Sequence, residues 1–319
     1  MGGGSWATAL AKLLLQNTDS IIWYMRRDDR IEDFKRLYHN PTYLSSIKFP
    51  IDRIQFDSDI NAVCNNADTL LMAMPSPYFK SHLSKLSADI SKKFIIVATK
   101  GIIPDENQAI SDYLIDHYGI SPDKIIIVSG PCHAEEVALD RLSFLTVASS
   151  NTDYADKFCK CINGNAMRTI TSSDVIGIEY AGVLKNIYAI ASGIVHGLKC
   201  GDNFQAMLLS NAIKEMELFL HAVNPAPRNI NDSVYLGDLL VTSYSRFSRN
   251  HNFGAMIGRG YSVKAAMMEM EMVAEGYYGT KCINEINKHY HIHMPILDCV
   301  YNILYNCKSP ATAITEMSE

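Results

Sequence analysis

Two lysines stand where a charged side chain can take part in chemistry. Lys185 lies in the otherwise apolar stretch 179–195, which is predicted to be a helix. Burial disfavours the charged form of an amine and lowers its pKa toward the range that suits proton transfer, so Lys185 is a candidate to protonate a carbonyl oxygen. The same position also suits a lysine whose aliphatic stem only covers apolar surface. Lys100 follows an apolar run and is expected at a strand end, where ligands of open α/β sheets collect.

A second candidate site lies farther along, where Gly237 and Asp238 precede the segment Ser248, Arg249 and Asn250. An arginine guanidinium can bond two phosphate oxygens at once, while serine and asparagine satisfy the remaining oxygens. The segment therefore suits a phosphate group, although a helix-capping loop has a similar composition.

A glycine-rich turn opens the chain and runs into a predicted helix over 6–16. Gly2, Gly4 and Ala7 match the G-x-G-x-x-A pattern in which a tight turn brings backbone close to a pyrophosphate at a helix N-terminus. The pattern is weak by itself, and a flexible terminus has a similar composition. The strand that normally feeds such a turn is absent from the sequence, and we expect it to be encoded upstream of Met1. Without it, we expect exposed strand edges, weak cofactor binding and poor solubility.

Arg26 and Arg27 follow the apolar run 20–25, at the place where dinucleotide folds contact the adenosine ribose. An acidic residue there suits NAD, whereas arginine accommodates the additional phosphate of NADP. The pair favours NADP, or the use of both cofactors, over two merely solvated arginines.

The elements that must position these residues change in character along the chain. Short apolar runs predict strands, and they alternate with helical or turn-rich stretches, as in a mostly parallel sheet; the runs are 20–25, 68–74, 93–98, 124–129 and 144–148. From residue 175 onward the segments are long and rich in alanine, leucine, methionine and isoleucine. We therefore predict an α/β nucleotide domain over 1–173 and an all-helical domain over 174–319.

Composition excludes several classes of protein. The chain is 48% hydrophobic with a net charge of −5, which gives no general attraction to nucleic acid or acidic membranes. Eight cysteines form no C-x-x-C pair, as expected for reduced thiols in the cytoplasm. No apolar run is long enough to cross a membrane. His289, His291 and His293 alternate without a nearby cysteine or carboxylate, so we expect no metal.

Taken in order, the motifs resemble NAD(P)-dependent glycerol-3-phosphate dehydrogenase of the bacterial type over essentially the whole chain. They are Gly2-x-Gly4-Ser5-Trp6-Ala7-Thr8-Ala9, Ala98-Thr99-Lys100-Gly101, Ser129-Gly130-Pro131, Gly182-Val183-Leu184-Lys185-Asn186, Gly201-Asp202-Asn203, Leu236-Gly237-Asp238, Ser248-Arg249-Asn250 and Ala274-Glu275-Gly276. The resemblance implies an N-terminal Rossmann-like, doubly wound domain and a helical substrate domain, with the active site in the cleft between them. It also implies a homodimer and a role in phospholipid synthesis.

The resemblance also implies roles for individual residues. Lys185 would be the general acid and base in the reduction of dihydroxyacetone phosphate, while Lys100 helps to hold the reacting oxygen and Asp238 orients the ammonium group. The cofactor, NADP or NAD with NADPH preferred, would be contacted by Gly2, Gly4, Ser5, Trp6, Arg26, Arg27, Lys100, Ala134, Arg249 and Glu275. The substrate would be surrounded by Lys100, Gly130, Cys132, Lys185, Asp238, Ser248, Arg249 and Asn250.

One departure weakens the transfer of roles. Cys132 and His133 stand where the family usually has serine or threonine followed by an aromatic residue, and a thiol is a poorer hydrogen-bond donor. Two alternatives stay open: a related two-domain dehydrogenase of 2-hydroxy acids or sugar acids, which would not need the phosphate anchor at Ser248–Asn250, and an inactive nucleotide-binding paralogue. Retention of Lys185, Lys100 and Asp238 argues against the second alternative.

Overall fold

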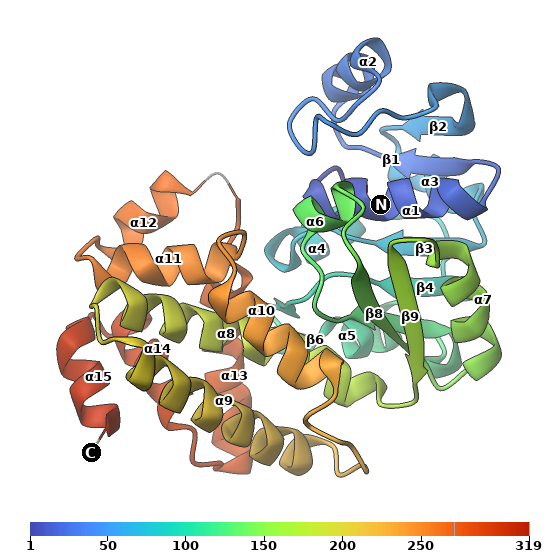
Figure 1. Cartoon of the computed structure of the whole chain (residues 1–319). Helices are drawn as coiled ribbons and strands as arrows, with labels where there is room; N and C mark the ends of the chain where they lie inside the picture. Colours follow the sequence, from blue (N-terminus) through green and yellow to red (C-terminus); the bar gives the residue numbers. More distant parts are fainter. Residues whose placement is uncertain (271, 319) are drawn as a thin grey trace. The chain divides into compact units, whose positions relative to one another are not determined.

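The computed structural model describes residues 1–270 and 272–318 (Figure 1). The chain divides into two compact units: unit 1 is Met1–Thr99 with Ile110–Val175, and unit 2 is Lys100–Ala109 with Ile176–Glu319. The segment Lys100–Ala109 thus belongs with the helical unit, although it precedes the boundary expected near residue 173.

Unit 1 is an α/β unit in which strands and helices alternate, and it confirms the predicted Rossmann-like class. Its strands are β1 (Ile21–Tyr24), β2 (Ile54–Asp57), β3 (Thr69–Met72), β4 (Phe94–Val97), β7 (Ile125–Ser129), β8 (Ser143–Ala148) and β9 (Met167–Ser172). Its α-helices are α1 (Ser5–Asn17), α2 (Asp28–Leu37), α3 (Ile60–Asn65), α4 (Ser76–Leu83), α5 (Ile110–Tyr118), α6 (Ala134–Ala138) and α7 (Thr152–Ile162).

The larger sheet of unit 1 has the order β3-β4-β7-β8-β9 (Figure 1). Its neighbours pair in parallel except β7 and β8, which are antiparallel. Every residue of β7 is buried, as expected for a strand in a sheet covered on both faces. Helix α1 packs beside α6 and α7, and its Leu10 and Leu13 join Ile96 and Phe158 in the core.

The sequence patterns did not reveal β2 or β9. Strand β9 carries polar residues at most positions, and only Met167 is buried among its six residues. Its extended form comes from pairing with β8 along its whole length. An apolar pattern could not have indicated such a strand, because its stability comes from the neighbouring strand rather than from its own burial.

The sheet is interrupted between β1 and β3, since β1 pairs only with β2 in a separate two-stranded sheet. The first residues of the chain lie in this interval. Met1 N donates to Leu71 O at 2.6 Å, and Ala73 N donates to Met1 O at 3.0 Å and Gly2 N to Tyr24 O at 3.2 Å. The sheet is therefore in two parts, and the backbone of Met1 and Gly2 connects them at this edge.

Unit 2 is helical apart from the short antiparallel pair β5 (Ile102–Ile103) and β6 (Gln108–Ala109). Its α-helices are α8 (Val175–Gly197), α9 (Asp202–Val223), α10 (Asp238–Tyr244), α11 (Arg249–Gly258), α12 (Val263–Glu269), α13 (Glu275–Tyr290), α14 (Pro295–Tyr305) and α15 (Pro310–Ser318). Among residues 1–270 and 272–318, none of the helices has the length and apolar character needed to cross a membrane.

Helix α8 is the centre of unit 2 and is buried on nearly every side, as expected for a helix that is apolar all round. Helix α9 contributes a buried carboxylate, Glu215, to this core. Glu215 is 4% exposed and accepts from the amides of Ile296 at 2.9 Å and Leu297 at 3.1 Å, at the start of α14. Burial raises the pKa of Glu215 to about 7.

Candidate active site

Lys185 lies in the middle of α8 with only 5% of its surface exposed. Burial lowers its pKa from 10.5 to about 7; the Asp238 carboxylate opposes this shift and the Lys100 ammonium adds to it. The predicted burial of this lysine is therefore confirmed. An amine with such a pKa can both give and take a proton near neutral pH.

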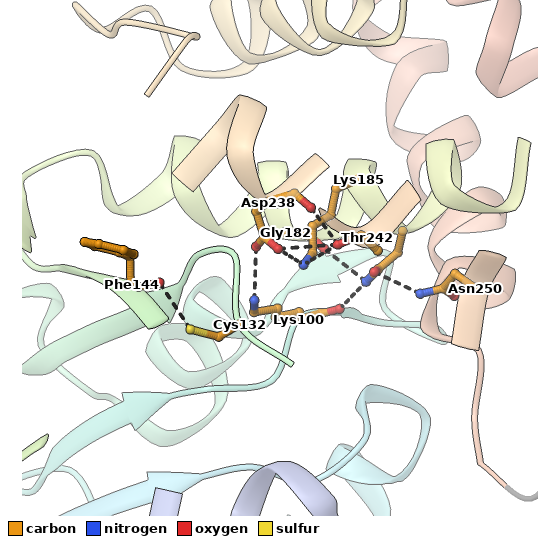
Figure 2. A network of polar contacts seen from close by, with 9 residues as sticks. Lys100, Cys132, Phe144, Gly182, Lys185, Asp238, Thr242 and Asn250 are labelled. Carbon is orange, nitrogen blue, oxygen red and sulfur yellow. Dashed lines mark hydrogen bonds and ion pairs between the residues drawn. The ribbon is translucent and has the colours of Figure 1, made fainter. Parts of the chain in front are cut away.

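Asp238 is the point on which the cationic side chains converge (Figure 2). It is 1% exposed and begins α10, directly after the π-helical turn Ser233–Gly237. Its Oδ1 accepts from Lys185 Nζ, and its Oδ2 accepts from Lys100 Nζ at 3.0 Å. Burial alone would raise the pKa of Asp238, but the Lys100 and Lys185 cations outweigh burial and lower it. The carboxylate thus stays charged and holds both amines.

Thr242 completes this cluster, and no sequence pattern had predicted a role for it. Its Oγ1 accepts from Lys185 Nζ at 3.1 Å and donates to the main-chain oxygen of Asp238 at 2.6 Å. Thr242 lies four positions after Asp238, which places the two side chains on one face of α10. That spacing is the signal that could have identified Thr242, once Asp238 was known to face Lys185.

Asn186 links the lysine cluster to the neighbouring helices; it belongs to the motif Gly182–Asn186, but no role was predicted for it. Its Nδ2 donates to the main-chain oxygen of Lys100 at 2.9 Å, and its Oδ1 accepts from Asn250 Nδ2 at 2.9 Å. Asn250 Oδ1 in turn accepts from the amide of Gly276 at 2.9 Å. A continuous chain of hydrogen bonds therefore joins Lys100, α8, α11 and the start of α13.

Glycines hold α11 against α8 at very short range. A Cβ added to Gly254 would lie 2.1 Å from Ile190 O, and one added to Gly193 would lie 2.0 Å from His251 O. No side chain larger than hydrogen fits at either position. This close crossing fixes where Asn250 lies along α8, and so it sets the hydrogen bond to Asn186.

The predicted phosphate-binding segment lies at the N-terminus of α11. Ser248 is buried and its Oγ accepts from His251 N at 3.2 Å, so this hydroxyl caps the helix. Arg249 is half-buried, and its guanidinium makes no hydrogen bond or ion pair within residues 1–270 and 272–318. Of the three predicted residues, Arg249 is thus the one whose polar groups are not engaged, and it stands at a helix end that favours anions. Glu275 begins α13 and is half-buried.

The predicted dinucleotide turn lies in unit 1, at the N-terminus of α1. Gly2 has φ +115° and a Cβ there would lie 2.9 Å from Ala73 O, whereas a Cβ at Gly4 would meet nothing within 4 Å. Ser5 Oγ and Trp6 Nε1 are buried without a hydrogen-bond partner among the described residues. A helix N-terminus with two unsatisfied donors and open space at Gly4 fits the phosphates of a dinucleotide.

The two arginines after β1 differ in their surroundings, although both are exposed. Arg27 donates from Nε to Asp29 Oδ1 at 2.9 Å and also forms an ion pair with that carboxylate. Arg26 makes no such contact within the described part of the chain. Arg26 is therefore the cation that can engage an added phosphate without first giving up a partner.

Gly130, Cys132 and Ala134 follow β7 in unit 1. Gly130 has φ +136°, and a Cβ there would lie 2.8 Å from Phe144 O, so glycine is required at this position. Cys132 Sγ donates to the same carbonyl oxygen at 3.2 Å (Figure 2). Ala134 is buried as the first residue of α6. The thiol is thus used in holding the loop to β8.

All eight cysteines are free thiols. Across the described ranges 1–270 and 272–318, no three histidine, cysteine, aspartate or glutamate side chains gather as ligands for a metal ion.

Comparison with known proteins agrees with this arrangement. Residues 174–315 match the family described as NAD-dependent glycerol-3-phosphate dehydrogenase C-terminus, and residues 1–155 match its N-terminus counterpart. A glycerol-3-phosphate dehydrogenase [NAD(P)+] from Lysinibacillus sphaericus is 34% identical over 98% of this chain and 93% of its own length. The Bacillus subtilis protein of that name is 33% identical over 99% and 92%.

A solved structure extends the similarity to the whole fold. The glycerol-3-phosphate dehydrogenase from Coxiella burnetii has 28% identity and a TM-score of 0.93, covering 100% of this chain and 97% of that one. The two matched family regions together span nearly all of the present chain. This chain therefore belongs to the NAD-dependent glycerol-3-phosphate dehydrogenase family.

Proposed function

We propose that this protein catalyses the reversible NAD(P)H-dependent reduction of dihydroxyacetone phosphate to sn-glycerol 3-phosphate. The observation that carries the proposal is the buried amine of Lys185, with its pKa near 7, held by Asp238 beside the Lys100 cation. Family membership supplies the substrate class, because relatives 33% and 34% identical carry the name of this activity.

The chain's own residues account for the proton in this reaction. When bound, the nicotinamide supplies hydride to the ketone carbon. The ammonium of Lys185 gives its proton to the ketone oxygen, becomes a neutral amine and regains a proton from solvent. Lys100 places a second positive charge beside the oxygen on which negative charge develops. Asp238 keeps both amines in position, and Thr242 accepts from Lys185 Nζ at 3.1 Å.

The phosphate of the substrate is bound at the start of α11 in this proposal. Arg249 supplies a guanidinium that can contact two phosphate oxygens. Ser248 acts by capping the helix, and Asn250 acts by connecting Asn186 to Gly276. Ser248 and Asn250 thus hold Arg249 in position, while Arg249 itself contacts the phosphate.

Cofactor binding is proposed for the predicted residues of unit 1 and for Lys100, Arg249 and Glu275. Ser5 Oγ, Trp6 Nε1 and the open space at Gly4 support phosphate binding there. Arg26 supports a preference for NADPH, since its side chain is not paired with a carboxylate as Arg27 is. Residues 1–173 then act as the nucleotide domain and residues 174–319 as the substrate domain.

The experiment is the oxidation of NADPH, and separately of NADH, by the purified 319-residue chain with dihydroxyacetone phosphate. Unphosphorylated dihydroxyacetone is the control substrate. Turnover confined to the phosphorylated ketone supports the proposal. Turnover of a 2-oxo acid equal to that of dihydroxyacetone phosphate would favour a 2-hydroxy-acid dehydrogenase. Binding of cofactor without any turnover would favour an inactive nucleotide-binding paralogue. The variant Arg249→Ala is expected to raise the KM for dihydroxyacetone phosphate with a smaller change in kcat.

The same proposal includes a metabolic role, a cellular location and an oligomeric state. The product, glycerol 3-phosphate, supplies the backbone of glycerophospholipids. The eight free thiols support a cytoplasmic location. The homodimer is carried over from the family resemblance, and sedimentation of the purified chain tests it.

A further inference from the structure

Asn40 lies in the loop after α2, and its side chain contacts the glycine turn that leads into α1. The residue is only 1% exposed. Its Nδ2 donates to Gly3 O at 3.0 Å and to Thr8 Oγ1 at 2.8 Å. Its Oδ1 accepts from the amide of Thr42 at 3.0 Å and from that of Tyr43 at 3.1 Å. The side-chain amide thus uses both of its N–H donors and both lone pairs of its oxygen.

The surroundings of Asn40 allow only one orientation of this amide. Two main-chain N–H groups face Oδ1, and a main-chain carbonyl faces Nδ2. A flipped amide would set donors against donors and an acceptor against an acceptor. Because the loop holds the oxygen, the nitrogen is directed at Gly3 O by the protein itself. Aspartate and leucine, which are close to asparagine in size, lack these two donors.

The hydrogen bond to Gly3 O sets the direction of an amide in the turn. The carbonyl of Gly3 and the N–H of Gly4 belong to one planar peptide unit, in which the two groups point in opposite directions. By holding Gly3 O, Asn40 therefore directs the N–H of Gly4 away from itself. A Cβ at Gly4 would meet nothing within 4 Å, so there is room for a ligand beside this residue.

Thr8 fixes the next carbonyl of the turn. It is fully buried, its Oγ1 accepts from Asn40, and the same hydroxyl donates to Gly4 O at 2.9 Å. The amide of Thr8 donates to that oxygen as well, at 3.0 Å. The N–H of Ser5 shares a peptide plane with Gly4 O and points the opposite way. Two successive amides are thus presented at the N-terminus of α1, where an anion is favoured.

We propose that Asn40 is a positioning residue for the cofactor, which fixes the turn so that the amides of Gly4 and Ser5 face the pyrophosphate of NADP or NAD. The inference rests on the cofactor site of the proposed function. Asn40 acts through Gly3 and Thr8, and a turn that is already held in place loses little conformational freedom when the ligand binds. The pyrophosphate is common to both cofactors, so loss of Asn40 should weaken NADPH and NADH by the same factor.

The test is the variant Asn40→Leu in the full 319-residue chain, because leucine keeps the size of the side chain and removes all four hydrogen bonds. The Kd values of NADPH and NADH are measured by fluorescence titration without substrate, and Tm is measured without cofactor. We expect both Kd values to rise about tenfold or more. The kcat at saturating cofactor and the KM for dihydroxyacetone phosphate should stay within about threefold of wild type.

Asn61→Leu is the matched control, since Asn61 fastens another loop of unit 1 with the same kinds of hydrogen bond. Its Oδ1 accepts from the amides of Ser87 at 2.7 Å and Ala88 at 3.0 Å, and its Nδ2 donates to Lys85 O at 3.1 Å. This variant should lower Tm, as Asn40→Leu does, and leave both Kd values unchanged. The comparison separates a loss of stability from a loss of cofactor binding.

Thr8→Val gives a second test that does not depend on the folding of Asn40→Leu. Valine has the shape of threonine, so the change removes only the hydroxyl that lies between Asn40 and Gly4 O. Both Kd values should rise about threefold or more while the protein stays folded.

An unchanged Kd for NADPH in folded Asn40→Leu, or in Thr8→Val, would overturn the role of Asn40. Weakening of NADPH alone would also refute it, since the effect would then come from the additional phosphate of NADP rather than from the pyrophosphate. A wild-type chain that binds neither cofactor would contradict the proposed cofactor site and this inference together. Tight binding by wild type that neither variant weakens would contradict this inference alone.

Discussion

Replacing Lys185 by methionine removes the ammonium group while keeping an unbranched side chain in the core, and we expect it to abolish proton transfer selectively. The pKa of Lys185 falls from 10.5 to about 7 through burial. At pH 7 this shift raises the neutral fraction of the amine from roughly 1 in 3000 to about half. The wild-type residue is thus available both as an acid and as a base, and loss of such a group costs roughly 10²- to 10⁴-fold in rate.

The rates of reduction and of oxidation are expected to change with pH in opposite senses. Reduction needs protonated Lys185, so its rate should fall about tenfold per pH unit above a pKa of about 7. Oxidation of glycerol 3-phosphate needs the neutral amine, so its rate should rise with pH and level off above that value. In Lys185→Met both limbs should disappear together with most of the turnover.

The assay measures kcat and kcat/KM in both directions from pH 5.5 to 9, together with the Kd of NADPH. Lys288→Met serves as the control, because Lys288 is an exposed lysine paired with Glu285 on the surface of α13. It should leave both profiles unchanged. A limb near pH 7 that persists in Lys185→Met, or a loss of turnover smaller than about tenfold, would refute the role of Lys185 in proton transfer.

Three further predictions concern other parts of the molecule. The raised pKa of Glu215 means that the folded state holds a proton between pH 4.5 and about 7 that the unfolded state has lost. The free energy of unfolding should therefore fall by up to about 3 kcal/mol as pH rises through this window. In urea unfolding, Glu215→Gln should show a smaller change of stability with pH than wild type, and an equal change would contradict this prediction. Gly254→Ala should lower stability by about 3 kcal/mol, because its Cβ would lie 2.1 Å from Ile190 O. Thermal unfolding and the KM for dihydroxyacetone phosphate check this prediction. A Tm equal to that of wild type would show that α8 and α11 can move apart to accept the methyl group. Arg26→Ala should raise the KM for NADPH about tenfold and that for NADH little, whereas Arg27→Ala should have a smaller effect; equal effects would show that the ion pair of Arg27 does not restrain it.

Local sequence patterns were sufficient for elements whose own residues favour one structure. The five predicted strands appear as β1, β3, β4, β7 and β8, because short apolar runs bounded by turns suit a buried sheet. The apolar stretch around Lys185 likewise forms a helix, α8, that is buried all round. The expected burial of Lys185 followed from its own neighbours in the chain, and so did the shift of its pKa.

The tertiary structure decided which of the candidate side chains meet. Lys100 and Asp238 are 138 residues apart, and Lys185 and Asp238 are 53 apart, so no local pattern could predict that one carboxylate holds both amines. Thr242 and Asn186 acquired their roles in the same way, from the packing of α10 and α11 against α8.

The physical reason for this division is the range of the forces involved. Helix and strand preferences act over a few neighbouring residues. The position of α11, in contrast, depends on a close approach between Gly254 and the backbone of α8 that leaves room only for a hydrogen atom. The order of the strands also arises from packing across the whole unit. The sequence by itself therefore determined the kinds of elements, the family and the candidate chemistry, while the tertiary structure alone decided the hydrogen-bonded cluster around Asp238.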